Sequence, residues 1–246
     1  MHSQKSTQTM VLAALLASGA AWAQAPAAQP DYTLSYNVGA VTDYRYRGIS
    51  QSRLRPALQG GIDFSHRSGF YLGTWASTIK WIKDAGGDAP VELDLYGGYK
   101  GTAGAVGYDV GVLRYQYPSH DLAVSPNTTE LYGAATFGVA TLKYSHAVTN
   151  LFGFSDSKNS YYLDASATFD IGNGYSIVPH IGYQKVKNNS EDSYTDYSVT
   201  LGKDFGNGFS ASAAIVATDV EHQHYVSPAG KSLGKTGLVL GAKYSF

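Results

Sequence analysis

The chain has 246 residues, of which 43% are hydrophobic and only 15% charged, with 28 glycines, 20 tyrosines and no cysteine. A formal net charge of -1 gives no reason to expect nucleic-acid binding, and the lack of cysteine excludes disulfides and thiolate metal sites. The length suits one large domain or two small ones.

The N-terminal stretch has the pattern of a secretion signal. Lys5 is followed by the apolar run 10–17, and Ala21-Trp22-Ala23 resembles a cleavage site before Gln24. The apolar run is shorter than the ~20 residues that a membrane-spanning helix needs. We therefore expect residues 1–23 to be a signal peptide cleaved between Ala23 and Gln24, residues 24–31 to be a short leader, and residues 32–246 to form the folded domain.

After this segment, apolar and polar residues alternate with the period of two that is typical of β-strands. Val91 and Leu93 face one way, for example, and Glu92 faces the other. The alternation predicts about twelve strands; ten or fourteen remain possible, because Arg114 and the 137–141 turn do not fit the pattern cleanly. The predicted strands cover residues 33–47, 55–66, 70–82, 91–101, 105–117, 128–138, 139–149, 160–171, 174–185, 194–204, 209–220 and 235–246.

The lengths of strands and connections indicate a membrane barrel. Many predicted strands reach the ~9–11 residues that a tilted strand needs to cross a bilayer, whereas strands of soluble sheets most often have ~5–6. Tight turns containing glycine or asparagine, such as 66–69 and 172–174, alternate with longer polar loops, such as 118–127 and 221–234. The sequence therefore predicts an all-β fold, a transmembrane antiparallel up-and-down β-barrel.

The last predicted strand places an apolar row on one face and ends on an aromatic residue. The row consists of Leu238, Leu240, Ala242, Tyr244 and Phe246. Outer-membrane barrels end in a similar way, and the barrel-assembly machinery reads that ending. We predict that Tyr244 and Phe246 form an assembly signal, and that this strand pairs with the first one to remove the edges of the sheet.

Tyrosine and tryptophan residues in the apolar phase are expected at the membrane interface, where the ring is dehydrated and its polar tip stays wet. They are Tyr36, Tyr44, Tyr71, Trp75, Trp81, Tyr99, Tyr108, Tyr144, Tyr183, Tyr197 and Tyr244. The ordinary strand propensity of tyrosine gives the same pattern.

If the apolar face meets lipid, the polar face lines the lumen. The candidate pore-lining residues are Asp43, Arg45, Arg47, Asp63, Lys80, Glu92, Asp94, Asp109, Glu130, Lys143, Asp164 and Asp196. Acidic residues outnumber basic ones on this face, which predicts a weak cation preference in an open pore. The cluster around Arg45 and Arg47 is expected near the outer mouth, either as a constriction or as a structural ladder of ion pairs.

Several stretches resemble a known family. The motifs are Thr-Asp-Tyr-Arg-Tyr-Arg-Gly-Ile-Ser-Gln at 42–51 and the segments 56–61, 69–77, 92–99 and 108–111, with looser matches at 129–132, 194–199 and the last strand. Together they resemble the TorF family of porin-type proteins of Gram-negative bacteria, over essentially the whole chain after the leader. The resemblance implies an outer-membrane barrel with a channel role, and it brings neither a substrate nor a catalytic motif.

These features predict a passive channel for small hydrophilic solutes in the bacterial outer membrane. The signal peptide would direct export of the chain to that location. One alternative is a closed structural or adhesive barrel, because opposite charges can lock into a plug and a barrel of about twelve strands is narrower than the 16–18-stranded porins. Loops without evident aromatic clusters argue mildly against adhesion. The expected partners are outer-membrane lipid and lipopolysaccharide, the barrel-assembly machinery and small solutes, and not nucleic acid.

A lipid-modifying enzyme is a further alternative. His66 and Ser68 lie in a predicted turn with no acidic partner at an obvious spacing, and the adjacent Ser145 and His146 do not by themselves make a nucleophile and its base. The spacing of His222 and His224 could bind a metal, but two histidines on a long loop are more often solvated. We therefore expect no enzymatic activity, no cofactor and no metal.

Overall fold

The computed structural model describes residues 30–221 and 224–246. The predicted signal peptide and its cleavage site between Ala23 and Gln24 lie outside these residues. The elements are β1 (Tyr32–Val41), β2 (Arg45–Tyr46), β3 (Ile49–Ser50), β4 (Ala57–His66), β5 (Phe70–Thr78), α1 (Trp81–Asp84), β6 (Val91–Ala103), β7 (Val106–Gln116), β8 (Thr128–Phe137), β9 (Ala140–Ala147), β10 (Tyr161–Ala167), β11 (Phe169–Gly172), β12 (Tyr175–Lys185), the 3₁₀ turn η1 (Ser190–Asp192), β13 (Tyr194–Gly206), β14 (Phe209–Thr218) and β15 (Gly237–Ser245). Neither helical element is long and apolar enough to cross a membrane.

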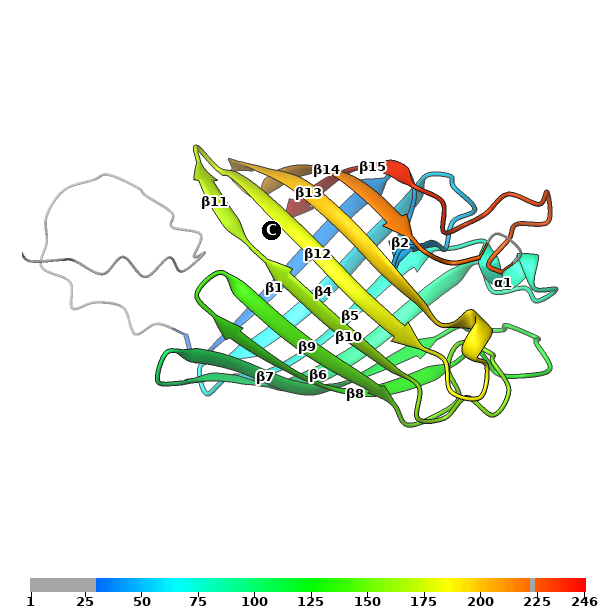
Figure 1. Ribbon diagram of the computed structural model, residues 1–246. Coiled ribbons are helices and arrows are strands. Elements are labelled where there is room, and N and C mark those ends of the chain that lie inside the picture. The colour runs from blue at the N-terminus through cyan, green and yellow to red at the C-terminus, as the bar shows by residue number, and fades with distance from the viewer. Residues whose placement is uncertain (1–29, 222–223) are drawn as a thin grey trace, which may run out of the picture. The chain divides into compact units, whose positions relative to one another are not determined.

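Within the described residues, twelve strands form a closed antiparallel ring (Figure 1). The ring consists of β1, β4 to β10 and β12 to β15; β15 pairs with β1, and β10 pairs with β12. The predictions of about twelve strands and of an up-and-down barrel are confirmed. The extra strand β11 lies outside the ring and continues the register of β10 along β12. The interruption between β10 and β11 faces Pro179, which has no backbone hydrogen to donate to a ladder.

The first and last strands meet as predicted. The β1–β15 pairing runs from Asn37 opposite Ser245 to Val41 opposite Gly241. Tyr36 and Phe246 then exchange two backbone hydrogen bonds of 2.9 Å each. The seam therefore leaves no open edge between these strands.

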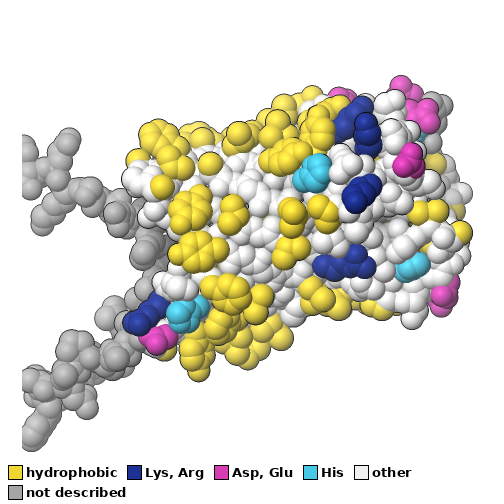
Figure 2. Space-filling model, turned by 90° about the horizontal axis from the view of Figure 1, so that it is seen from below, with side chains coloured by type: hydrophobic (Ala, Val, Ile, Leu, Met, Phe, Trp, Pro, Cys, Tyr) yellow, Lys and Arg dark blue, Asp and Glu magenta, His cyan; other side chains and the backbone are white. Residues whose placement is uncertain are grey.

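The outer face of the barrel is apolar (Figure 2). Leu58, Leu72, Val110 and Leu131 each expose about half or more of their surface there. A water-soluble protein rarely carries so wide an apolar surface, whereas a lipid environment stabilises it. Most of the predicted interfacial tyrosines are exposed: Tyr36, Tyr99, Tyr108, Tyr144, Tyr183, Tyr197 and Tyr244.

The remaining predicted interfacial aromatic residues lie elsewhere, so that part of the prediction is wrong. Tyr71 faces inward, crosses the inner face over Gly98, and donates a hydrogen bond of 2.5 Å to Asp109. Trp75 packs against Tyr44 inside the barrel, with ring centroids 5.4 Å apart. Trp81 begins α1 in the loop after β5. Tyr71 and Trp75 alternate with the exposed Phe70 and Leu72 on β5, so their phase points inward, and Trp81 lies beyond the end of that strand.

Short turns and long connections lie at opposite ends of the barrel, as predicted (Figure 1). Three strand ends differ from prediction by four residues or more: β1 ends at Val41 instead of residue 47, β5 at Thr78 instead of residue 82, and β10 at Ala167 instead of residue 171. The six residues 42–47, which the prediction had assigned to the first strand, belong to a connection that folds into the barrel.

Candidate functional site

The connection between β1 and β4 forms a small hairpin of β2 and β3, which we call the inner hairpin (residues 45–50). Its two central residues, Arg47 and Gly48, have φ values of 47° and 80°, the sign that a tight two-residue hairpin turn requires. A Cβ atom at Gly48 would collide with Thr218 and Asp196 on β14 and β13. The tip of the inner hairpin therefore touches the barrel wall, and only glycine fits there.

Arg47 fastens this tip to the far side of the ring. Its guanidinium donates to the Glu130 carboxylate at 3.0 and 2.7 Å and to Gln184 Oε1 at 2.6 Å. It also lies 4.2 Å from the ring centroid of Tyr162 and 4.8 Å from that of Tyr46. The side chains of Arg47 and Glu130 are only 6% and 1% exposed. This two-pronged, buried pair makes the inner hairpin a bridge across the lumen.

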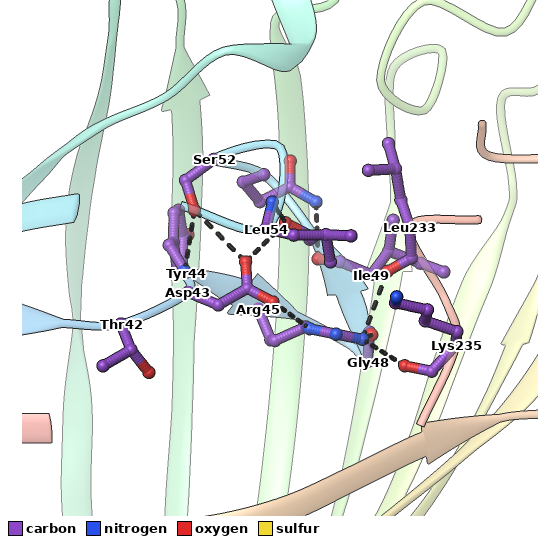
Figure 3. Close-up of polar contacts among 12 residues, drawn as sticks. Thr42, Asp43, Tyr44, Arg45, Gly48, Ile49, Ser52, Leu54, Leu233 and Lys235 are labelled. Carbon is purple, nitrogen blue, oxygen red and sulfur yellow. Dashed lines mark hydrogen bonds and ion pairs between the residues drawn. The ribbon is translucent and has the colours of Figure 1, made fainter. Parts of the chain in front are cut away.

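Asp43 and Arg45 hold the base of the inner hairpin (Figure 3). Arg45 Nε donates to Asp43 Oδ2 at 2.6 Å, and its Nη1 donates to the carbonyl oxygens of Leu233 and Lys235 at 3.1 and 3.0 Å. Asp43 Oδ1 accepts hydrogen bonds from Ser50 and Ser52 at 2.5 and 3.2 Å. The hairpin base is thereby tied to the connection between β14 and β15.

A layer of tyrosines seals the inner hairpin against the β6–β8 wall. Tyr44 and Tyr117 donate hydrogen bonds of 2.5 and 2.7 Å to the buried Glu92 carboxylate. Burial, together with Glu92 and Asp94, raises the pKa of Tyr44 well above its usual value, so its hydroxyl stays protonated and donates. The hydroxyl groups of Tyr46 and Tyr115 lie 2.5 Å apart. Polar groups that sequence reasoning placed along an open pore are thus packed together on this side.

Within the described residues, cavities lie along the barrel and at its mouth. A polar central cavity of about 430 Å³ is lined in part by Arg45, Arg47, Lys143, Asp164, His180 and Asp196. A second cavity of about 450 Å³ includes Asn37, Gln59 and Lys243 in its lining. An outer cavity of about 270 Å³ is lined by the aromatic rings of Tyr46, Trp81, Tyr117, Phe152, Tyr194 and Tyr225. Because Tyr46 lines both the outer and the central cavity, the inner hairpin is the partition between them.

The other predicted pore-lining residues take different positions. Asp63 and Asp109 accept hydrogen bonds of 2.5 Å from Tyr96 and Tyr71. Lys143 lies 4.2 Å from the Tyr132 ring centroid. Asp94 is 9% exposed, and its Oδ1 has no hydrogen-bond partner within the described part of the chain.

Lys80 is the outlying member of the predicted set. It is exposed, directly precedes α1 and lies two residues beyond the end of β5 at Thr78. The predicted strand over 70–82 is too long, because the chain leaves the wall after Thr78. Lys80 therefore does not share an inner strand face with the other residues.

Sequence reasoning missed several residues that complete this site. His180 Nε2 lies 2.9 Å from Asp164 Oδ2, and Tyr162 donates to Asp196 Oδ2 at 2.8 Å. Tyr115 contacts Glu130, and Tyr162 contacts Asp196. Gln184 contacts Arg47. Period-two alternation along the predicted strand 174–185 already put His180 and Gln184 on the inner face, which is a signal that could have found them.

The loops do contain aromatic clusters, contrary to the sequence-based expectation. The Tyr225 ring packs against Tyr194 and Phe154, with centroids 5.4 and 6.2 Å away. Phe152 packs against Tyr46 and Tyr115. These rings come together only in the folded barrel, because they are contributed by separate connections.

The two pairs considered for catalysis are not alike. His66 Nδ1 lies 2.8 Å from Ser68 Oγ in an exposed turn, and no acidic side chain within residues 30–221 and 224–246 hydrogen-bonds to either. Ser145 is buried on the inner face, whereas the adjacent His146 contacts Tyr144 and Asn159 on the outer face. Neither pair forms a nucleophile, base and orienting acid.

The metal candidate cannot be assembled from the described residues. His222 lies outside them, and His224 Nδ1 lies 2.9 Å from Asp192 Oδ1. No group of three or more histidine or acidic residues in the described ranges could hold a metal ion.

The predicted assembly residues lie on the lipid-facing surface beside the seam. Phe246 is 67% exposed, and its ring centroid lies 5.7 Å from that of Tyr36 and 5.8 Å from that of Tyr244. The three rings form a stack across β1 and β15. This is their geometry; their role in assembly stays a prediction.

A family model described as "Bacterial protein of unknown function (Gcw_chp)" matches residues 24–246. No curated protein matches the chain. The TorF label inferred from the motifs stays a prediction.

Several solved structures have a similar fold at low sequence identity. The KdgM porin is 11% identical with a TM-score of 0.57, covering 86% of this chain and 99% of its own. The NanC porin is 11% identical with a TM-score of 0.54, covering 87% and 99%. The COG4313 outer membrane channel from Pseudomonas putida F1 is 12% identical with a TM-score of 0.51, covering 89% and 96%. At this identity the likeness establishes a porin-like barrel and nothing finer.

Proposed function

The chain belongs to the Gcw_chp family of bacterial proteins, and we propose that it is a passive outer-membrane channel for small hydrophilic solutes, narrowed by the inner hairpin. The proposal is supported chiefly by the polar cavities that occupy the lumen on the inner side of the hairpin. An apolar outer face and neighbours that are porins or channels support the membrane location and the class of function.

A closed barrel without transport is the second candidate. It is favoured by the burial of Arg47 and Glu130 and by the tyrosine layer around Glu92. In that case the inner hairpin would be a permanent plug. The two candidates differ in one measurable property, the conductance of the folded protein.

For the open channel we propose a weak cation preference. Arg45 and Arg47 are neutralised by Asp43 and Glu130, so they contribute little net charge to the central cavity. Asp164 and Asp196 line that cavity together with Lys143 and His180, and the His180 ring lies 2.9 Å from Asp164 Oδ2 and 3.5 Å from Asp196 Oδ1. Fixed charges along a pore set its ion preference, and the acidic pair tips a nearly even balance toward cations.

Removing these two acids should reverse the preference. In planar bilayers with a salt gradient, the wild-type protein is expected to give a small cation-selective reversal potential. The variant Asp164→Asn with Asp196→Asn is expected to shift it to the anion-selective sign, because Lys143 then keeps only Asp109 and the Arg47-paired Glu130 as nearby carboxylates. The matched control is Asp88→Asn with Asp121→Asn, which removes two exposed loop acids. An anion-selective wild type, or an unchanged potential in the lumen variant, would refute the proposed preference.

A further inference from the structure

The outer face carries a group of basic side chains near the long-loop end of β7 to β12. We call it the basic patch: Arg114, His146 and Lys185 on strands, and Lys158 and Lys187 in the adjoining loops. Figure 2 shows Lys, Arg and His side chains gathered on this side, between the apolar belt and the loops. Arg114 had stood out in the sequence as a charge on an apolar face.

Strand pairing places members of the basic patch side by side. His146 is opposite Tyr161, and Tyr161 is opposite Lys185, so the three side chains are direct neighbours on the outer face. Arg114 donates to Thr129 Oγ1 on β8 at 2.9 Å. Thr129 on β8 and Tyr161 on β10 thus lie between the patch members on β7, β9 and β12.

The basic patch begins where the apolar belt ends. Two residues before Lys185 on its strand is the exposed Tyr183, and two residues before His146 is the exposed Tyr144. The ring of Tyr161 lies between them, with centroids 5.7 Å from Tyr144 and 6.3 Å from Tyr183. Tyrosines at such a boundary favour the headgroup level of a bilayer, and cations beyond them extend toward it.

The cations of the patch are not neutralised by the protein. Within the described part of the chain, Arg114, Lys158, Lys185 and Lys187 form no ion pair with an acidic side chain. Lys158 and Lys187 are exposed, and Lys185 is half-buried. An anion of suitable size would meet several charged donors at once.

Near the long-loop end, the patch cations that lie on strands are on one side of the ring, although the long connections elsewhere also expose Arg55, Lys80, Lys231 and Lys235. On β13, β14 and β15 the exposed outer-face residues include the uncharged Tyr197, Ile215 and Leu238. Cations that only fix the orientation of the barrel in the membrane would be expected on strands all around the ring. A one-sided cluster instead fits a discrete ligand.

We propose that the basic patch binds the phosphate groups of a phosphorylated lipid headgroup in the outer leaflet, an inference that rests on the proposed outer-membrane location. Arg114 and Lys185 contact the phosphates by charge-assisted hydrogen bonds, and Tyr144, Tyr161 and Tyr183 pack against the apolar part of the headgroup and the upper acyl chains. Lys158 and Lys187 add attraction from the loops.

The test measures binding of diphosphorylated lipid A to the refolded full chain in detergent micelles. Arg114→Gln with Lys185→Gln removes two charges and keeps polar side chains. Because each basic residue near an anionic lipid surface strengthens binding by about fivefold, affinity is expected to fall by about 25-fold. The control Lys203→Gln removes an outward-facing cation at the short-turn end, which packs on Tyr175 and Phe205, and should bind as the wild type does.

Two further measurements separate this inference from the proposed function. Dephosphorylated lipid A should bind the wild type as weakly as the diphosphorylated lipid binds the double variant, and conductance in neutral phospholipid should be the same for wild type and variant. Equal affinity of wild type and double variant, equal binding of the dephosphorylated lipid, or an equal loss in Lys203→Gln would overturn the lipid site. Lack of conductance in all variants with intact lipid binding would refute the channel and leave the lipid site standing.

Discussion

Arg47→Ala is expected to convert a mostly obstructed channel into a mostly open one. The substitution leaves the Glu130 carboxylate, 1% exposed, without its charged partner, and it removes the cation that lies over Tyr162. Removing one partner of a buried ion pair lowers stability by about 3–5 kcal/mol. The equilibrium between the inner hairpin held against the far wall and the hairpin released from it should therefore shift toward release by about two to three orders of magnitude. Single-channel recording measures this as a rise in the open fraction.

Two variants serve as controls for Arg47→Ala. Arg53 lies in the same connection and pairs with Asp84, but its side chain is 36% exposed; because such pairs contribute about 0–1 kcal/mol, Arg53→Ala should leave the open fraction nearly unchanged. Adding Glu130→Gln to Arg47→Ala removes the unpaired buried charge and should restore part of the obstruction. Reduced heat stability of Arg47→Ala with an unaltered open fraction would identify the pair as a purely structural ladder.

Phe246→Ala is expected to impair assembly of the barrel without altering its conductance. The Phe246 ring stacks on Tyr36 across the seam and on Tyr244 beside it. Aromatic pairs contribute about 0.5–1.5 kcal/mol each beyond their area. Because only the pair with Tyr36 crosses the seam, the seam loses about 0.5–1.5 kcal/mol, or about two- to thirteenfold in the equilibrium for closure. The amount of heat-modifiable barrel in outer-membrane fractions measures the effect.

Phe137→Ala is the matched control for that experiment. Phe137 lies at the end of β8 and is 66% exposed, nearly as exposed as Phe246. It loses a similar contact with lipid but lies away from the seam, so its barrel should reach near wild-type levels. Equal levels of all three proteins would contradict the assembly role of the terminal residue.

The sequence predicted the barrel wall well because lipid and lumen impose the same alternation on every strand. Ten-residue strands such as β4 and β8 fall within about two residues of their predicted bounds. The seam between β1 and β15 followed from the same physics, since an open edge is not tolerated in a membrane.

The site was predicted less well, because the inner hairpin imitates a strand. Asp43, Arg45 and Arg47 alternate with Tyr44 and Tyr46 as wall residues would, yet the chain leaves the wall at Thr42 and turns at Gly48. An Arg-Gly pair is a weak turn signal compared with Asn-Gly. Nothing local in the sequence indicates that Arg47 has a partner on β8.

An inner-face aromatic residue was the second source of error. Tyr71 lies against the inner wall, where Gly98 on the neighbouring strand leaves room for its ring. It alternates with the exposed Phe70 and Leu72, so strict period-two alternation places it on the inner face. Its aromatic side chain, and not its phase, led to the wrong assignment.

In the proposed channel the lumen conducts solutes, and the inner hairpin limits the current. Single-channel recording should compare the wild type with a variant in which residues 45–50 are replaced by a glycine–serine segment of equal length. The wild type is expected to give small discrete conductance steps, and the variant to give steps several times larger, because the partition between the outer and central cavities is lost. A correctly folded variant with no conductance above that of the bare bilayer would contradict the account.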